Sequence, residues 1–311
     1  MAQVAYRMLK VLFPNDTVML KQLADDQKRA KLVSGTASST DIAAGEAIAN
    51  AVAEKALARL RTDGMGQAAG NPTIWAQLES NAAARGNTMT WKSMETPARP
   101  MMLAMFGNVK LWQINTKQRD SLRPEPPPYP GSEKFKQELA EVASIKRNTN
   151  SKEWQIALYW ADGVGTYTPP GHWNEIASFK IAGEKLSELR TARAFSLLNM
   201  AMADAGICVW DTKSYYFTAR PSQADPSLKT IGLPNFPSYT SGHSTFSGAA
   251  ASVLGYLFPS SAATYSKMAL EASESRIYGG IHFRSDCEVG LRCGNAIGSF
   301  SVNFGRNDGS Q

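Results

Sequence analysis

The sequence predicts an all-α protein made of two packed helical bundles, and three observations carry this prediction. Apolar residues recur at helical spacing in several long segments. Strand-like alternation is sparse, and dipeptides typical of hairpins do not join apolar runs. With 311 residues, of which 43% are hydrophobic, the chain is long enough to bury a large core in one or two domains.

Apolar periodicity places the individual helices. The segments expected to be helical are residues 2–13, 40–61, 135–145, 154–160 and the stretch from 174 to about 206. Pro97 and Pro100 confine the start of a further apolar run at 97–114, and Asn150 is a candidate cap for the helix at 154–160. The stretch TPPGHW, residues 168–173, is expected to interrupt the helical pattern.

A proline-rich stretch is the best candidate for a boundary within the chain. Residues 123–131, RPEPPPYPG, hold five prolines and cannot continue a helix. We therefore expect an N-terminal helical half at 1–122, a connector at 123–131 and a C-terminal helical half at 132–311. The two halves are expected to pack as one compact unit, with any functional site in the second.

Charge and hydropathy exclude several classes of protein. The net charge of +6 comes from 33 Lys and Arg against 27 Asp and Glu, and these residues are scattered. No cluster of basic and aromatic residues typical of nucleic-acid binding occurs. No run of 18 apolar residues is present, so we expect no integral membrane protein, and no signal peptide opens the sequence. The three cysteines, Cys208, Cys287 and Cys293, do not form an even disulfide framework and leave the redox compartment open.

The stretch PSYTSGHSTFSG, residues 237–248, combines a helix start with a histidine. Ser241 is a candidate N-cap, and apolar residues follow at helical spacing to Leu257. His243 then lies in the first turn, beside free backbone N–H groups and the positive end of the helix dipole. Such a position favours a bound anion. A plain polar helix cap would explain this stretch equally well.

A second histidine stands in SRIYGGIHFRSD, residues 275–286. His282 precedes Asp286 by four residues, and on a helix that spacing places the two side chains on one face. An aspartate that accepts the Nδ1 proton leaves Nε2 free as a nucleophile or ligand. By itself the pair could also be incidental, at a capped helix.

Three cations add to these two histidines. Lys213 and Arg220 lie seven residues apart around an aromatic stretch, and Pro221 prevents one continuous helix there. Arg276 is the third cation. Guanidinium groups match the geometry of tetrahedral oxyanions, and a lysine adds a point charge, so together these residues could hold an oxyanion.

The order and spacing of these blocks resemble a known superfamily. They are similar to the three-part signature of the type 2 phosphatidic acid phosphatase and vanadium haloperoxidase superfamily. The first block is Lys213, six residues and Arg220-Pro221, and the second is Ser241-Gly242-His243. The third is Arg276, five residues, His282, three residues and Asp286. One departure is Thr240, where the family pattern usually has a proline. The resemblance implies a haloperoxidase-like or acid-phosphatase-like all-α fold around a buried oxyanion site.

The resemblance also implies roles for these residues. His282 would be the vanadium ligand in a haloperoxidase or the nucleophile in a phosphatase, Asp286 would orient it, and His243 would be the general acid and base. The oxyanion would be bound by Lys213, Arg220, Ser241, Gly242 and Arg276, and Lys213 would also assist catalysis. The implied cofactor is vanadate, and phosphate could occupy the same site.

Other features favour the haloperoxidase branch over the phosphatases. Trp210 and Phe236 resemble the aromatic pair that lines the halide side of chloroperoxidase-type sites, although core packing would explain them equally well. Residues 159–174 resemble a stretch of bacterial homologues, in which Asp162 is similar to an acid that pairs with an active-site arginine. His172, in the same stretch, is interpreted as structural or surface. The partners would then be hydrogen peroxide and a halide, or a phosphate ester if the protein is a phosphatase. The chain could form a homo-oligomer. The family resemblance favours a location outside the cytoplasm.

Three further classes explain the sequence less well. A metal hydrolase needs more His or Cys ligands than three histidines provide. A serine hydrolase would need a Gly-x-Ser-x-Gly elbow, which Gly242-His243-Ser244 does not match. A helical binding module without catalysis leaves the three anion-site blocks unexplained.

Overall fold

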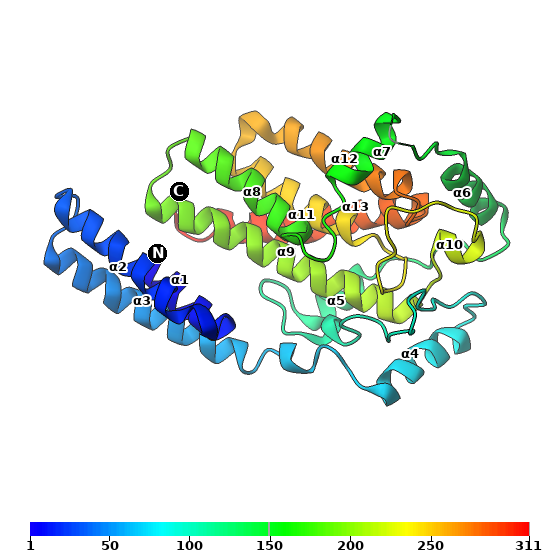
Figure 1. Cartoon of the computed structure of the whole chain (residues 1–311), viewed down its shortest axis with the longest axis horizontal. Helices are drawn as coiled ribbons and strands as arrows, with labels where there is room; N and C mark the ends of the chain where they lie inside the picture. The colour runs from blue at the N-terminus through cyan, green and yellow to red at the C-terminus, as the bar shows by residue number, and fades with distance from the viewer. Residues whose placement is uncertain (149, 311) are drawn as a thin grey trace. The chain divides into compact units, whose positions relative to one another are not determined.

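The computed structural model describes residues 1–148 and 150–310, and over these residues the protein is all-α (Figure 1). Within this described part the helices are not accompanied by any β-strand, and an isolated bridge joins Thr90 to Thr218. The prediction of an all-α fold is confirmed. The thirteen α-helices are α1 (Ala2–Leu12), α2 (Thr17–Val33), α3 (Ser39–Leu60), α4 (Pro72–Ala84), α5 (Thr116–Leu122), α6 (Glu133–Ser144), α7 (Lys152–Tyr159), α8 (Thr168–Gly183), α9 (Glu188–Tyr216), α10 (Pro221–Ala224), α11 (Gly242–Leu257), α12 (Ala262–Tyr278) and α13 (Arg284–Arg306).

The chain divides into two compact units, Met1–Gly66 and Gln67–Gln311. In the first unit, α1 packs against both α2 and α3. The start of α3 is set by a capping box, in which the Ser38 side chain accepts from the Asp41 N–H and the Asp41 carboxylate accepts from the Ser38 N–H. This reciprocal bonding explains why the helix begins where the sequence predicts.

The proline-rich connector, residues 123–131, lies inside the second unit. Two tyrosine hydroxyls tie it there, since Tyr216 Oη donates to the Pro124 carbonyl at 2.6 Å and Tyr239 Oη donates to the Glu125 carbonyl at 2.7 Å. The structural division at Gly66 therefore differs from the boundary that the sequence suggested at this connector. Composition marks the prolines, but the long-range hydrogen bonds decide with which unit they pack.

Four helices, α9, α11, α12 and α13, form the centre of the second unit, and α11 contacts each of the other three (Figure 1). Glycines allow α11 and α13 to approach closely. A Cβ atom added to Gly294 of α13 would lie 2.2 Å from the Thr245 carbonyl oxygen of α11. This close packing holds the N-terminal turn of α11 in a fixed position against α13.

The longest helix, α9, is long and apolar enough to cross a membrane. Of the most apolar 18-residue stretch of this helix, 61% is buried inside the protein. Core helices of soluble proteins pass the same length and composition test. The helix also carries Lys213, which is fully buried.

Two local predictions are corrected by the structure. The stretch TPPGHW does not interrupt the helical pattern but begins α8, with prolines in the first turn. Prolines are tolerated there because the first N–H groups of a helix have no intrahelical partner. Ser151, not Asn150, caps α7, since its hydroxyl accepts from the Trp154 N–H at 3.0 Å.

Candidate oxyanion site

Three buried cations come from three different elements. Lys213 lies in the last turn of α9, Arg220 directly before α10 and Arg276 in the last turn of α12. Their exposed fractions are 0%, 2% and 1%. Within residues 1–148 and 150–310, none of the three forms an ion pair with a carboxylate. A cluster of this kind is unusual, because a buried charge is normally paired.

Backbone carbonyls accept the hydrogen bonds of these cations. Lys213 Nζ donates to the carbonyls of Pro237 and Ser238 at 2.7 and 2.8 Å. Arg220 donates to the carbonyls of Phe236 at 3.0 Å and Ile281 at 2.6 Å. Residues 236–238, just before α11, are therefore held by two cations from separate elements.

Arg276 is fixed in the same manner from another side. Its Nε donates to the Ser275 hydroxyl at 2.8 Å, and one terminal nitrogen donates to the Ala157 carbonyl at 3.0 Å. Dipolar partners of this kind orient the guanidinium group but leave its charge without a counter-charge.

Burial shifts the pKa of each cation downward. The pKa of Lys213 lies well below its usual value because of burial and then the neighbouring Arg220 charge, and Asp286 opposes this only in part. Burial lowers the pKa of Arg220 to about 9 and that of Arg276 to about 10. A bound anion would offset this electrostatic cost, as expected at the predicted oxyanion site.

His282 and Asp286 form a buried pair at the start of α13. His282 Nδ1 lies 2.9 Å from Asp286 Oδ2, and Arg220 Nη1 lies 3.4 Å from His282 Nε2. Because a guanidinium only donates, Nε2 must accept, and the proton is assigned to Nδ1. Burial and then the charges of Arg220, Lys213 and Arg276 hold the pKa of His282 well below its usual value. His282 is thus a neutral imidazole with the lone pair of Nε2 directed at the cations.

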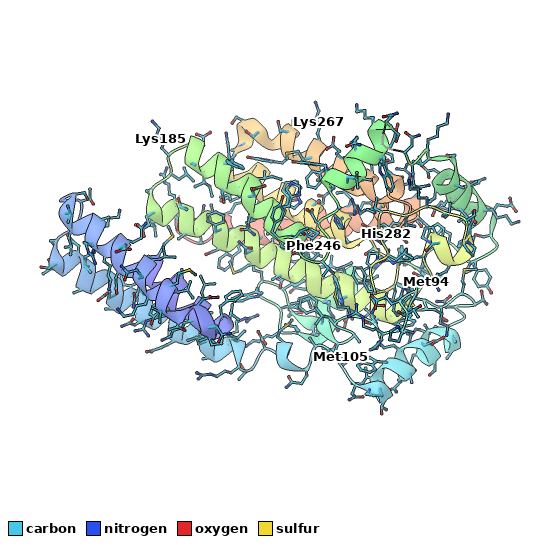
Figure 2. The ribbon with its side chains drawn as sticks, in the orientation of Figure 1. Met94, Met105, Lys185, Phe246, Lys267 and His282 are labelled. Atoms are coloured by element: carbon cyan, nitrogen blue, oxygen red, sulfur yellow. The ribbon has the colours of Figure 1, made fainter. Side chains whose placement is uncertain are left out.

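The pair does not stack on one helix, as the four-residue spacing had suggested. His282 lies on the segment that joins α12 to α13, whereas Asp286 is in the first turn of α13 (Figure 2). Asp286 Oδ2 also accepts from the Phe283 N–H at 3.1 Å. A helix start bonded by its own aspartate therefore brings the two side chains together, and Gly280, with a φ of +74°, allows the preceding turn.

Ser238 is a site residue that the sequence analysis missed. Its hydroxyl donates to Asp286 Oδ2 in a short hydrogen bond and lies 3.3 Å from His282 Nδ1. The side chain is fully buried. Its position inside the stretch 237–248 was the only signal in the sequence, and nothing there distinguished it from the other serines.

The N-terminus of α11 adds backbone donors and a second histidine. Ser241 caps the helix by accepting from the Ser244 N–H at 3.2 Å, as predicted, and its own N–H donates to the Asp286 carbonyl at 2.9 Å. Gly242 is the first residue of α11, and His243 follows it.

His243 lies in this first turn with an unused nitrogen. Its Nε2 is buried and has no hydrogen-bond partner among the described residues. Burial, then the charges of Arg276 and His282, hold the pKa of His243 well below its usual value. A buried, unpartnered imidazole nitrogen normally has a partner in the functional state.

Trp210 and Phe236 contact each other beside the cations. Their ring centroids are 5.1 Å apart, and Lys213 Nζ and the Arg220 guanidinium lie 5.0 and 5.1 Å from the Phe236 ring centroid. Trp210 Nε1 donates to the Met102 carbonyl at 3.0 Å. Both rings also belong to an apolar cluster, so core packing and proximity to the site occur together.

Asp162 pairs with a histidine, where the resemblance implied an arginine. His172 Nδ1 lies 3.1 Å from Asp162 Oδ2, and Arg276 acts on Asp162 only through its charge. His172 is buried, stacks on Trp160 at 4.4 Å between ring centroids, and its Nε2 lies 3.3 Å from Tyr159 Oη. Of the two interpretations of His172, structural or surface, the structure supports the structural one, because α8 begins earlier than predicted and carries this histidine inward.

The residues present suit an oxyanion better than a bare metal ion. In the described part of the chain, no group of three or more His, Cys, Asp or Glu side chains could hold a metal ion. The buried cations and the helix start at Ser241 supply instead the kinds of group that an oxyanion needs.

Comparisons with known proteins identify relatives of this arrangement. Residues 194–309 match the family model of the PAP2 superfamily. The vanadium chloroperoxidase of Curvularia inaequalis is 33% identical over 141 residues, which covers 34% of this chain and 23% of that protein. The chain thus aligns with about a quarter of the length of this curated relative.

Solved structures share the fold over nearly the whole chain. The crystal structure of the first bacterial vanadium-dependent iodoperoxidase matches with a TM-score of 0.76 and 26% identity, over 93% of this chain and 75% of that one. The holo-type bacterial vanadium-dependent chloroperoxidase matches with a TM-score of 0.71 and 14% identity, over 98% and 81% of the two chains. The resemblance inferred from the three motifs, to the vanadium haloperoxidases and their superfamily, is confirmed.

Proposed function

From the match of residues 194–309 to the family model of the PAP2 superfamily, we propose that this protein is a vanadium-dependent haloperoxidase-like enzyme. It would oxidise a halide with hydrogen peroxide at a vanadate held by His282. The observation that carries the proposal is the group of three buried cations without carboxylate ion pairs, one of which, Arg220, lies 3.4 Å from the acceptor nitrogen Nε2 of His282. The names of the structural relatives favour halide oxidation over phosphate hydrolysis.

The residues of the site fit vanadate. An oxyanion has several oxygens that need positive charge and hydrogen-bond donors. The site offers three cations, backbone N–H groups at the start of α11 and the unpartnered Nε2 of His243. The residues that would hold it are Lys213, Arg220, Ser241, Gly242, Arg276 and, through Nε2, His282. Bound vanadate would supply Lewis-acid activation of hydrogen peroxide without a change in its own oxidation state.

Each side chain then has a defined task. Asp286 and Ser238 keep the proton of His282 on Nδ1, so that Nε2 remains a ligand. Burial holds the pKa of His243 below its usual value, which favours the neutral imidazole, and this form would accept a proton from hydrogen peroxide as a general base. Lys213 and Arg220 stabilise negative charge that develops on oxygen during the reaction.

The halide would approach on the aromatic side of the site. Phe236 is in contact with Lys213 and Arg220, and Trp210 packs against Phe236. The positive edges of aromatic rings and the nearby cations favour a weakly hydrated anion such as bromide or iodide. We propose Trp210 and Phe236 as the wall of this halide pocket, with Asp162 supporting the site through its charge on Arg276.

A second candidate function uses the same residues. The PAP2 match favours a soluble acid phosphatase acting on phosphate monoesters. Nε2 of His282 would attack phosphorus and form an N–P bond, while the P–O bond to the alcohol breaks and the protonated form of His243 gives its proton to the departing oxygen. Water would then release phosphate and restore the free imidazole.

Two assays on one preparation distinguish the candidates. The first measures bromination of a phenolic dye with hydrogen peroxide and added vanadate, and the second measures hydrolysis of an aryl phosphate without vanadate. For the proposed haloperoxidase, vanadate switches on the first activity and aryl phosphate turnover stays low. Fast ester hydrolysis that vanadate inhibits, with no halogenation of bromide or iodide, would establish the phosphatase instead.

A further inference from the structure

A cavity of about 520 Å³ is lined by Asp286 together with residues outside the candidate oxyanion site. The proline-rich connector forms one wall with Pro127 and Tyr129, and the end of α9 forms another with Tyr216. Glu138 of α6 lines it as well, so the connector, α6 and the end of α9 meet there. Cavities of roughly 300–1,000 Å³ commonly bind small organic molecules. Neither the halide site nor the oxyanion site accounts for it.

Glu138 is a buried carboxylate that is only half satisfied. Its exposed fraction is 5%, and its Oε2 accepts from both the N–H and the hydroxyl of Ser285, at 3.2 and 2.8 Å. Its Oε1 is buried and has no hydrogen-bond partner among the described residues. Burial raises the pKa of Glu138, and the charge of Asp286 adds to this, whereas Lys134 opposes it through charge alone. A buried acceptor without a donor is destabilising, so this oxygen is where a ligand would gain most.

The charges around the cavity favour a cation. Glu125, Glu138 and Asp286 line it, against a single cation, Arg85. Arg85 is already engaged, because it donates to the Tyr215 carbonyl at 2.6 Å and its guanidinium lies 4.1 Å from the Tyr215 ring centroid.

The remaining walls are aromatic and apolar. Phe135, Tyr129 and Tyr216 line the cavity together with the prolines of the connector. Aromatic faces attract ammonium groups, and proline rings accept an apolar body. A carboxylate beside aromatic rings is a common environment for an amine ligand.

We propose that this cavity binds a small organic amine. Its ammonium group would donate to Glu138 Oε1, and an aromatic or apolar body would pack against Tyr216 and the connector prolines. The cavity and the oxyanion site share only Asp286 as a wall residue. The amine site is therefore separate from the halide chemistry, and its test does not depend on that activity.

The test uses the whole chain and two probes that differ in one group. Tyramine carries a phenol and an ammonium, and tyrosol has the same frame with a hydroxyl in place of the ammonium. Isothermal titration should show tyramine binding with an affinity at least about tenfold higher than tyrosol, since a charged hydrogen bond is worth about 1.5 kcal/mol or more. Equal affinities, or no binding of tyramine at millimolar concentration, would overturn the proposal.

Variants locate the binding to this cavity. Glu138→Gln should lower tyramine affinity about tenfold or more and leave tyrosol unchanged. Glu133→Gln, on the exposed side of the same helix, is the matched control and should bind tyramine like the natural protein. Met89→Trp, which fills the cavity, should abolish binding of both probes even if Glu138→Gln fails to fold. Unchanged tyramine binding in folded Glu138→Gln or Met89→Trp would show that the amine binds elsewhere.

Discussion

His282 Nδ1 lies 2.9 Å from Asp286 Oδ2, and the two side chains are 2% and 1% exposed. The proton of the imidazole is thereby confined to the side away from the cations. Arg220 confirms this assignment from the other side, because its Nη1 can only donate to Nε2 at 3.4 Å. Under the proposed function, this relationship makes His282 the ligand or nucleophile and leaves proton transfer to His243.

Separate substitutions of the two histidines should separate these roles. His282→Ala should abolish both turnover and vanadate retention, because the bond to the anion is lost. His243→Ala should lower turnover by about 10²- to 10⁴-fold while vanadate remains bound. Equilibrium dialysis of vanadate with each variant, next to the activity assay, measures both effects. Equal vanadate retention in the two variants would contradict the assigned roles.

Ser238→Ala should impair catalysis through Asp286. Without the donated hydrogen bond, the pKa of Asp286 rises further, because this bond is what lowers it most. Turnover should fall about tenfold, and the acidic limb of the pH profile should move to higher pH. Ser299→Ala, on the exposed face of α13, is the control and should leave the profile unchanged. A loss of turnover without a shifted profile would reduce Ser238 to a structural role.

Oxyanions should stabilise the protein against heat through Lys213 and its neighbours. Phosphate at 100 times its dissociation constant should add about 2.7 kcal/mol to the free energy of unfolding. Lys213→Met should weaken phosphate binding by at least about tenfold, since a hydrogen-bond donor and its positive charge are removed. Thermal denaturation across a phosphate titration measures both. Lys117→Met, an exposed lysine of α5, should behave like the natural protein, and the same response from both variants would argue against a phosphate site at Lys213.

The stability of the anion-free protein should depend on pH through both histidines. Their pKa values lie well below the usual 6.5 in the folded protein, so the unfolded chain binds more protons near that pH. The free energy of unfolding should therefore fall as the pH drops below about 6.5, by up to about 1.4 kcal/mol per pH unit for each histidine. Urea denaturation between pH 7.5 and 5 should give a shallower slope for His282→Ala. Identical slopes would show that His282 does not titrate with a lowered pKa.

Gly294→Ala should destabilise the centre of the second unit. The added Cβ would lie 2.2 Å from the Thr245 carbonyl oxygen, so α11 and α13 would have to separate. We expect a loss of about 1–3 kcal/mol and a weaker oxyanion site, because Thr245 is two residues from His243. Gly183→Ala, with no atom within 4 Å of its new Cβ, should be neutral or stabilising by up to about 1 kcal/mol. Denaturation by urea compares the two, and equal stabilities would contradict the tight packing.

The sequence by itself determined the helical class, the positions of most helices and the residue types of the site. Apolar periodicity and caps act over a few residues, so α3 and the Ser241 cap of α11 could be predicted without knowledge of the rest of the chain. The resemblance carried by the three motif blocks also pointed to the three cations and both histidines, and their roles at an oxyanion site stay predictions.

The tertiary structure decided which groups meet. Ser238 reaches Asp286 across 48 residues, and the connector joins the second unit through tyrosine hydroxyls from other elements. His172 became a buried partner of Asp162 because α8 begins at the prolines and turns that histidine inward. Local sequence patterns carry no information about such pairings. The pairings are stabilised by hydrogen bonds between buried polar groups, and these groups belong to segments that only folding brings together.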